Sequence, residues 1–175
     1  MSKAFTRESD DLVDLPVRPR PASPLPPGAK NYFTPAGERR LREELNGLLQ
    51  VERPRLASNG SDDDGKRQLQ SLDQRIYQLQ ESFRSAVVVP PPAGPQDAVL
   101  FGATVTVRGR VGYESRYQIV GVDETDIDQG WVSWLSPIAK ALLNARTGQR
   151  VRFKFPSGED ELEIVSVTYE SDGAI

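Results

Sequence analysis

The residues of this 175-residue chain that could do chemistry are of few types. It has no cysteine and no histidine, which excludes disulfides, thiolate metal sites and the commonest general base and zinc ligand. Carboxylates, hydroxyls, lysines or a partner must therefore supply any chemistry. The densest acidic cluster lies in residues 58–65, where the chain reads Asp62, Asp63, Asp64. Basic side chains gather near the same place, at Arg53, Arg55, Lys66 and Arg67.

Two apolar-periodic segments flank this acidic cluster. Apolar side chains recur on both sides at steps of three or four residues, which is typical of a coiled-coil seam. Folding the segments back about residue 62 pairs Leu41 with Phe83, Leu45 with Leu79, Leu48 with Ile76 and Glu52 with Leu72. The spacing predicts an antiparallel helical hairpin within residues 31–89, with the three aspartates at its tip.

Local signals indicate where the two helices begin and end. Thr34 followed by Pro35 is typical of an N-cap and a first helical position. The second helix is expected to begin within residues 61–64 and to end near Ser85. Pro54 interrupts the first arm because it removes a backbone hydrogen bond. Two outcomes stay open: the helix bends near Pro54, or it ends at Arg53.

Composition divides the rest of the chain. Residues 1–30 hold six prolines and little apolar periodicity, which is typical of a disordered leader, with a docking peptide as the alternative. The Pro/Gly run at residues 90–97 predicts a stiff linker. No apolar run approaches 18 residues and the start of the chain has no signal-peptide core, so a cytoplasmic protein is expected.

Residues 98–175 have the pattern of a small antiparallel sheet covered by one helix, so the predicted fold class is α+β. Strands are expected over residues 98–107, 116–122, 130–134, 150–155 and 162–169. Ser136 followed by Pro137 predicts the start of a short helix. Residues 97–175 carry 8 basic and 12 acidic groups. Protein surfaces are therefore better expected partners for this part than free nucleic acid.

Three stretches of the C-terminal part resemble the Gre transcript-cleavage factors. They are residues 99–105 (VLFGATV), 117–124 (YQIVGVDE) and 136–143 (SPIAKALL). The order of hairpin, linker and sheet is also similar, and residues 44–46 and 52–54 resemble the GreB branch. The resemblance covers about residues 31–170. It implies an FKBP-like C-terminal domain that docks at the secondary channel of bacterial RNA polymerase while the hairpin enters the channel.

The resemblance also implies a mechanism and a set of partners. In this family the tip carboxylates approach the catalytic magnesium and help hold a second metal ion and a water, so that the polymerase hydrolyses backtracked RNA. Asp62, Asp63 and Asp64 would be those carboxylates, with Mg²⁺ shared with the polymerase and no metal stably bound by this chain alone. The chain would be an accessory factor, not an enzyme. Its partners would be RNA polymerase and the RNA and DNA of the elongation complex, with no membrane, and it is expected to be a monomer.

Two departures from the family pattern bear on cleavage. The cleavage-competent tip carries an Asp and a Glu three residues apart followed by Asn-Ala, whereas here it reads Asp62-Asp63-Asp64-Gly65. The hairpin is about a dozen residues shorter than the GreB pattern, which removes ~9 Å of reach. Rnk, a Gre relative with a stubby coiled coil, binds polymerase without the cleavage tip. A non-cleaving regulator of this kind is the alternative to a cleavage-stimulating elongation factor.

The candidate residues at the tip each have a second, structural interpretation. The aspartates can cap the second helix and complement its dipole, for about 0.3–1 kcal/mol each. The basic residues Arg53, Arg55, Lys66 and Arg67 could contact RNA or an acidic channel wall, or they could pair with neighbouring acids on a solvated face.

The C-terminal part has its own candidates. The proposed polymerase contacts are Asp123, Glu124, Ser136, Pro137 and Lys140. Asp123 and Glu124 could equally form a solvated acidic loop, and Ser136 and Pro137 could serve in capping and packing. Because FKBP-like folds also occur in prolyl isomerases, an isomerase or chaperone is the rival function of another class.

Overall fold

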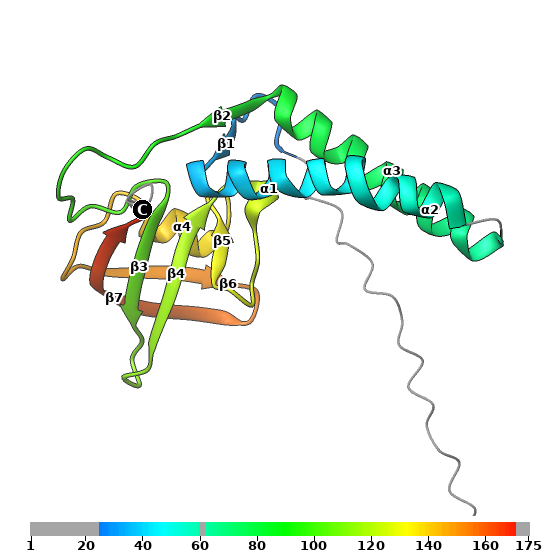
Figure 1. The fold of residues 1–175 in the computed structure, drawn as a ribbon. Coiled ribbons are helices and arrows are strands. Elements are labelled where there is room, and N and C mark those ends of the chain that lie inside the picture. The colour runs from blue at the N-terminus through cyan, green and yellow to red at the C-terminus, as the bar shows by residue number, and fades with distance from the viewer. Residues whose placement is uncertain (1–24, 60–61, 171–175) are drawn as a thin grey trace, which may run out of the picture.

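The structure is a computed structural model that describes residues 25–59 and 62–170. A helical hairpin extends to one side of a curled five-stranded sheet (Figure 1). The predicted leader lies for the most part outside the described residues. Within those residues, no helix is both long enough and apolar enough to cross a membrane.

The first arm of the hairpin is helical beyond Pro54. It consists of α1 (Pro35–Gly47), the π-helical segment η1 (Leu48–Glu52) and α2 (Arg53–Asn59). As predicted, Thr34 caps α1, because its hydroxyl accepts a hydrogen bond from the Gly37 backbone N–H (3.0 Å). A proline cannot donate to the preceding turn, and here the wider π-helical turns come directly before it. The alternative in which the helix ends at Arg53 is therefore wrong.

The second arm, α3 (Asp63–Arg84), lies beside the first (Figure 1). Two ion pairs join the arms, Arg75 Nε to Glu44 Oε1 and Arg53 Nε to Asp73 Oδ1, at 2.7 and 2.8 Å. Their partners follow in opposite order along the two arms, so the arms run antiparallel. The base of the hairpin holds a small apolar cluster in which Phe33, Leu41 and Leu79 are buried.

The base of the hairpin also contains two strands that the sequence pattern does not predict. β1 (Asn31–Phe33) and β2 (Ala86–Val88) pair in parallel, with Tyr32 opposite Val87. They lie inside the span predicted for the helical hairpin, whose ends are therefore strands. Because β2 continues in the direction of α3 whereas α1 runs the opposite way, the chain reverses between β1 and α1, at Thr34 (Figure 1).

The main sheet carries the larger core. Its strands, in the spatial order β5-β4-β3-β7-β6, are β3 (Ala103–Arg108), β4 (Glu114–Val120), β5 (Trp131–Ser133), β6 (Arg150–Phe155) and β7 (Gly158–Tyr169). The short helix α4 (Pro137–Leu142) contacts both edge strands, β5 and β6, and so closes the curl. Ten buried residues fill the space between them, among them Val105, Ile119, Leu142 and Ile164.

Two details of the predicted sheet are wrong. The sheet is not wholly antiparallel, because β5 pairs in parallel with β4 and places Trp131 beside Gln118. Residues 121–130, which open with the 3-10 turn η2 (Val122–Glu124), carry the chain back along β4 before β5 begins. The first long strand begins at Ala103 instead of residue 98, because Gly102 adopts a left-handed conformation (φ +84°) that interrupts the extended chain.

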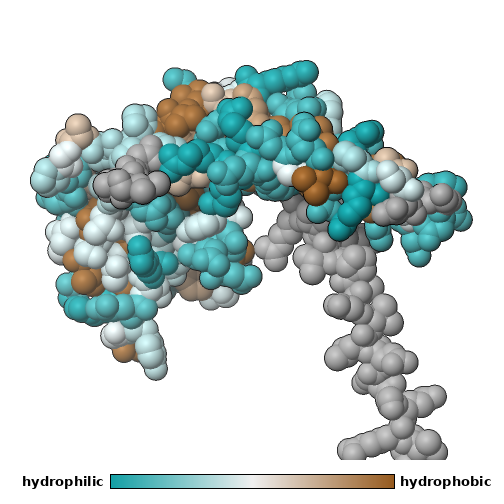
Figure 2. Space-filling view, viewed as in Figure 1, coloured by the Kyte–Doolittle hydropathy of each residue, from teal (hydrophilic) through white to brown (hydrophobic). Residues whose placement is uncertain are grey.

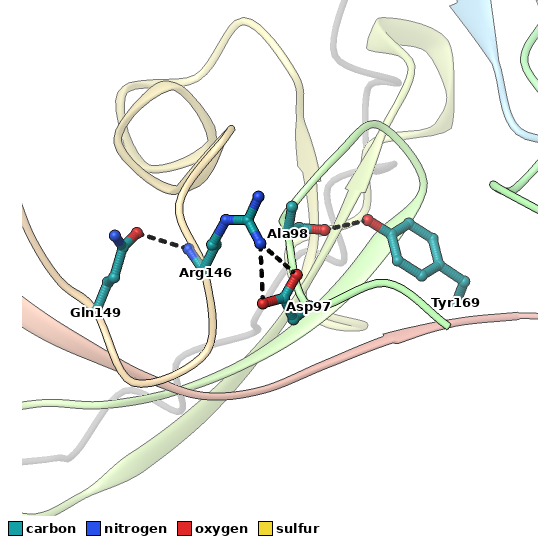
Figure 3. A network of polar contacts seen from close by, with 5 residues as sticks. All are labelled: Asp97, Ala98, Arg146, Gln149 and Tyr169. Carbon is teal, nitrogen blue, oxygen red and sulfur yellow. Dashed lines mark hydrogen bonds and ion pairs between the residues drawn. The ribbon is translucent and has the colours of Figure 1, made fainter. Parts of the chain in front are cut away.

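Polar contacts attach the end of the linker to the sheet (Figure 3). The Tyr169 hydroxyl at the end of β7 donates to the Ala98 carbonyl (2.6 Å), and Arg146 Nη1 donates to both carboxylate oxygens of Asp97 (3.0 and 3.2 Å). The Arg146 backbone N–H in turn donates to Gln149 Oε1 (2.8 Å). Residues 97–98 are therefore held against both the end of β7 and the turn before β6.

Candidate functional site

Asp62 at the hairpin tip acts as a helix cap. Its Oδ1 accepts a hydrogen bond from the Gly65 backbone N–H (2.8 Å), and Asp62 precedes the first residue of α3. An N-cap carboxylate satisfies one of the amides that the first turn leaves unpaired and interacts favourably with the helix dipole. One oxygen of this carboxylate is thus engaged within the tip itself.

Asp63 and Asp64 are exposed in the first turn of α3. Their side chains are 90% and 81% accessible to solvent. Each lies near a base one turn further on, Asp63 with Lys66 (3.5 Å) and Asp64 with Arg67 (3.7 Å). Within the described residues, no three acidic side chains are arranged so that they could hold a metal ion.

The four basic candidates near the tip all have acidic neighbours within the hairpin. Arg53 pairs with Asp73 across the arms, Arg55 pairs with Glu52 (3.2 Å), and Lys66 and Arg67 pair with the tip aspartates. All four are exposed, and exposed ion pairs contribute only ~0–1 kcal/mol. Such pairs can exchange their partner for a nucleic-acid phosphate or a protein carboxylate at little cost.

The tip and the C-terminal candidates lie in different parts of the molecule. The end of α2 and the start of α3 project away from the sheet and do not fold against it (Figure 1). On the sheet side, the Ser136 hydroxyl caps α4 by accepting from the Ala139 N–H (3.2 Å), whereas Pro137 and Lys140 are exposed. The structure therefore does not bring the two groups together into one site.

Glu124 is not part of a solvated acidic loop, which corrects that interpretation, whereas its contact with polymerase stays a prediction. It is only 3% exposed. Its Oε2 accepts hydrogen bonds from the backbone N–H groups of Thr34 and Gly121 (both 2.9 Å), and its Oε1 accepts one from the Thr34 hydroxyl. The carboxylate therefore joins η2 of the sheet domain to the N-cap of α1. Neighbouring Asp123 is half-buried and accepts from Asn31 Nδ2 (3.3 Å).

Two glycines make room for this contact between hairpin and sheet. A Cβ on Gly37 would lie 1.5 Å from Glu124 Oε1, and a Cβ on Gly121 would lie 2.0 Å from the Tyr32 carbonyl oxygen. Sequence reasoning missed both. The available signal was Gly37 in the first turn of a predicted helix, where glycine costs about 1 kcal/mol relative to alanine and so indicates a close approach.

The environment of Glu124 changes its acidity. Burial raises the pKa of this carboxyl above its ordinary value of 4.5, although the hydrogen bonds from Thr34 and Gly121 and the positive charge of Arg40 act to lower it. Desolvation outweighs these contacts because the carboxyl has little access to water.

Aromatic side chains complete the junction. Tyr32 of β1 packs edge-on against Trp134 and tilted against Phe101, with ring centroids 5.2 and 5.6 Å apart. The Arg40 guanidinium of α1 lies 4.2 Å from the centre of the Trp131 ring, within cation–π range. The two tryptophans of the chain therefore both contact residues at the base of the hairpin.

Comparison with known proteins identifies the family. Residues 94–169 match the family described as "Transcription elongation factor, GreA/GreB, C-term". Transcription elongation factor GreB of Neisseria meningitidis serogroup B is 41% identical over 154 residues, which cover 80% of this chain and 94% of the relative. GreA of Alkalilimnicola ehrlichii is 41% identical over 156 residues, covering 81% and 99%. The chain belongs to the GreA/GreB family of transcription elongation factors, which are accessory factors and not enzymes.

A solved structure of GreA/GreB from Nitrosomonas europaea is similar over 80% of this chain and 100% of its own length, with 25% identity and a TM-score of 0.40. The family assignment rests on the sequence matches.

Proposed function

We propose that this chain binds RNA polymerase at the secondary channel and regulates it there without stimulating transcript cleavage. The sheet domain, with an FKBP-like fold, would remain at the channel rim, and the hairpin formed by α1, α2 and α3 would enter. This function places the protein in the cytoplasm with the polymerase. Pro137 and Lys140 would contact the rim, because both are exposed beside the capped start of α4.

One observation supports the proposal that the chain does not stimulate cleavage: Asp62 is the N-cap of α3. A carboxylate oxygen that accepts from the Gly65 amide is held against the helix end and is less available to a metal ion. Asp63 and Asp64 remain, but the glutamate of the cleavage-competent pattern is missing. The hairpin, which is about a dozen residues shorter than the GreB pattern, would reach ~9 Å less far, whereas catalytic placement tolerates errors of only about 1 Å.

Cleavage stimulation is the second candidate, and the exposure of Asp63 and Asp64 favours it. In that case these two carboxylates would help hold a magnesium ion shared with the polymerase active centre. Arg53, Arg55, Lys66 and Arg67 would then lie close to RNA, where they could exchange their present acidic partners for phosphate groups.

Backtracked elongation complexes separate the two candidates. The chain is added at saturating concentration and RNA length is followed on a gel, in parallel with a double variant Asp63→Asn/Asp64→Asn. We expect no shortening of the RNA, together with inhibition of a cleavage-competent Gre factor added as a competitor. RNA shortening that the double variant loses would overturn the non-cleaving proposal in favour of the second candidate.

A prolyl isomerase remains the rival of another class. The structure has a cleft of about 420 Å³ at the junction of hairpin and sheet, lined among others by Pro35, Val89, Gln118 and Tyr169. Tyr169 is the one aromatic side chain among its described lining residues, and its hydroxyl is engaged by Ala98 and Leu100. We therefore expect no acceleration of isomerisation in a proline-peptide assay.

A further inference from the structure

We propose that Glu124 is a positioning residue, which fixes the direction in which the helical hairpin leaves the sheet domain. It belongs to η2 of the sheet domain, yet two of its three hydrogen-bond donors belong to Thr34 of the hairpin. The consequence for polymerase rests on the proposed function, whereas the structural role does not.

The contact between Glu124 and Thr34 lies at the point of the chain that sets the direction of α1. Thr34 is the residue at which the chain reverses between β1 and α1, and its hydroxyl both donates to Glu124 and accepts from Gly37. The carboxylate therefore holds the N-cap through its backbone and its side chain at once. Because α1 begins with the next residue, the orientation of this first turn sets the orientation of the whole arm.

The length of the first arm amplifies any change of its orientation at Thr34. Residues 35–59 are helical and extend ~37 Å at 1.5 Å per residue. A tilt of about 10° at Thr34 would move the tip by ~6 Å. Productive placement of groups in an active centre is sensitive to shifts of about 1 Å. A hairpin that enters a channel therefore needs a rigid base.

Glu124 is suited to this role in a way that the other junction contacts are not. The Asn31–Asp123 hydrogen bond is long at 3.3 Å, and the contacts of Arg40 with Trp131 and of Tyr32 with Trp134 involve half-buried or exposed side chains. Glu124 instead combines burial with three donors. Such a group needs all its partners, because leaving buried donors unpaired is costly. A Cβ on Gly37 would overlap the Glu124 carboxyl, and a Cβ on Gly121 would overlap the Tyr32 carbonyl, so a side chain at either position would force its neighbour to move.

Distance measurement between spin labels tests the inference in the full-length chain. The chain has no cysteine, so Ser58→Cys near the tip and Val111→Cys in the β3–β4 turn introduce two unique labelling sites, both exposed. Double electron–electron resonance then reports the distance from hairpin to sheet. With Glu124 present we expect a single narrow distribution. Glu124→Ala is expected to broaden or shift it by ~6 Å or more, as the lever estimate gives.

Three further variants keep the test independent of any loss of folding. Gly37→Ala should displace the Glu124 side chain, whose Oε1 lies 1.5 Å from the new Cβ, and change the distribution while the charge is retained. Gly47→Ala is the matched control in the same helix, because nothing lies within 4 Å of its new Cβ. Glu124→Gln should rescue the narrow distribution, since its amide oxygen can accept from both backbone amides and its NH₂ can donate to Thr34.

The outcomes distinguish this inference from the proposed function. A folded Gly37→Ala variant with the unaltered narrow distribution would overturn the positioning role. Binding of the same variants to purified RNA polymerase is measured separately. If the unlabelled wild-type chain fails to bind polymerase, the proposed function fails, while the effect of Glu124 on the label distance still decides the positioning role.

Discussion

The sheet domain and the helical hairpin are stabilised by different means. Ten buried residues form the sheet core, and α4 closes it from one side. In the hairpin, three residues are buried in the cluster near its base and Ile76 is also buried, whereas its outer part carries exposed ion pairs such as Arg53–Asp73. On the face seen in Figure 2, this outer part is mainly hydrophilic. The sheet domain is thus the more stable region, and the hairpin is a solvated projection from it. The contacts of Glu124 fix the base of this projection.

The difference predicts where the chain opens first. Few buried contacts and exposed backbone hydrogen bonds favour local opening. We expect amides of α2 and of the start of α3 to exchange hydrogen faster than those of β3 and β7. Substitutions should accordingly cost most in the sheet core, less at the junction and the helix cap, and least at the exposed ion pair of the hairpin.

The largest effect is expected in the sheet core. Ile164→Ala removes a fully buried side chain and should lower the free energy of unfolding by about 2–5 kcal/mol. Urea unfolding followed by tryptophan fluorescence measures this, because Trp131 and Trp134 both lie in or next to β5. The control is Val111→Ala, whose side chain is 80% exposed and whose cost should stay within about 0.5 kcal/mol. Equal costs for the two variants would contradict the assignment of the core.

Glu124 should give the next largest effect, and one that depends on pH. Its folded-state pKa is raised by burial, so the folded state binds more protons than the unfolded state above pH 4.5. The free energy of unfolding of the wild type should therefore fall as the pH rises from near 4.5 through the raised pKa, and its Glu124 contribution should be constant above that. Glu124→Gln has no titrating carboxyl at this position and so lacks this pH-dependent contribution. Its stability relative to the wild type should rise with pH over the same window; a difference independent of pH would be inconsistent with a raised pKa.

Glu124→Ala separates the hydrogen bonds from the charge. It leaves the buried amides of Thr34 and Gly121 without their acceptor, at a cost of roughly 1–3 kcal/mol. Chemical denaturation of this variant and of Glu124→Gln at one pH gives the comparison. A stability equal to that of Glu124→Gln would show that the hydrogen bonds are unimportant.

Removal of the helix cap at the tip should have a smaller effect. Asp62→Ala is expected to cost about 1 kcal/mol, because the Gly65 amide loses its acceptor. Asp63 makes no capping hydrogen bond, so Asp63→Ala should cost only about 0.3–1 kcal/mol, through the lost interaction with the helix dipole. Helix content followed by circular dichroism during thermal unfolding compares the two. The capping role would be refuted if Asp63→Ala proved the more damaging.

The smallest effect is expected for the ion pair across the arms. A double-mutant cycle with Arg53→Ala and Asp73→Ala should give a coupling of about 0.2–1 kcal/mol that decreases as salt is added, because both side chains are about half exposed. A coupling of several kcal/mol that salt leaves unchanged would mean that the outer hairpin is stabilised much as the core is.

Features that depend on neighbours in sequence were predictable. Thr34 before Pro35, Asp62 before α3 and Ser136 before Pro137 cap helices where expected, and β6 matches its predicted bounds of 150–155. Each of these depends on interactions within a few residues.

Features that depend on distant segments were not predictable from local pattern. Glu124 binds Thr34, 90 positions away, and no periodicity indicates such a partner. β5 is parallel to β4 because of the path that residues 121–130 take through space. β1 and β2 have three residues each, and their pairing depends on the hairpin bringing its two ends together. The roles of the tip residues toward polymerase remain predictions.

The position of the hairpin tip within a polymerase complex tests the central claim most directly. A cryo-electron microscopy structure of the chain bound to a stalled elongation complex would give the distance from Asp63 and Asp64 to the catalytic magnesium. We expect the sheet domain at the channel rim and the tip inside the channel, with both carboxylates short of the metal by several ångströms. Either carboxylate coordinated to the magnesium, or a hairpin that lies outside the channel, would contradict the account.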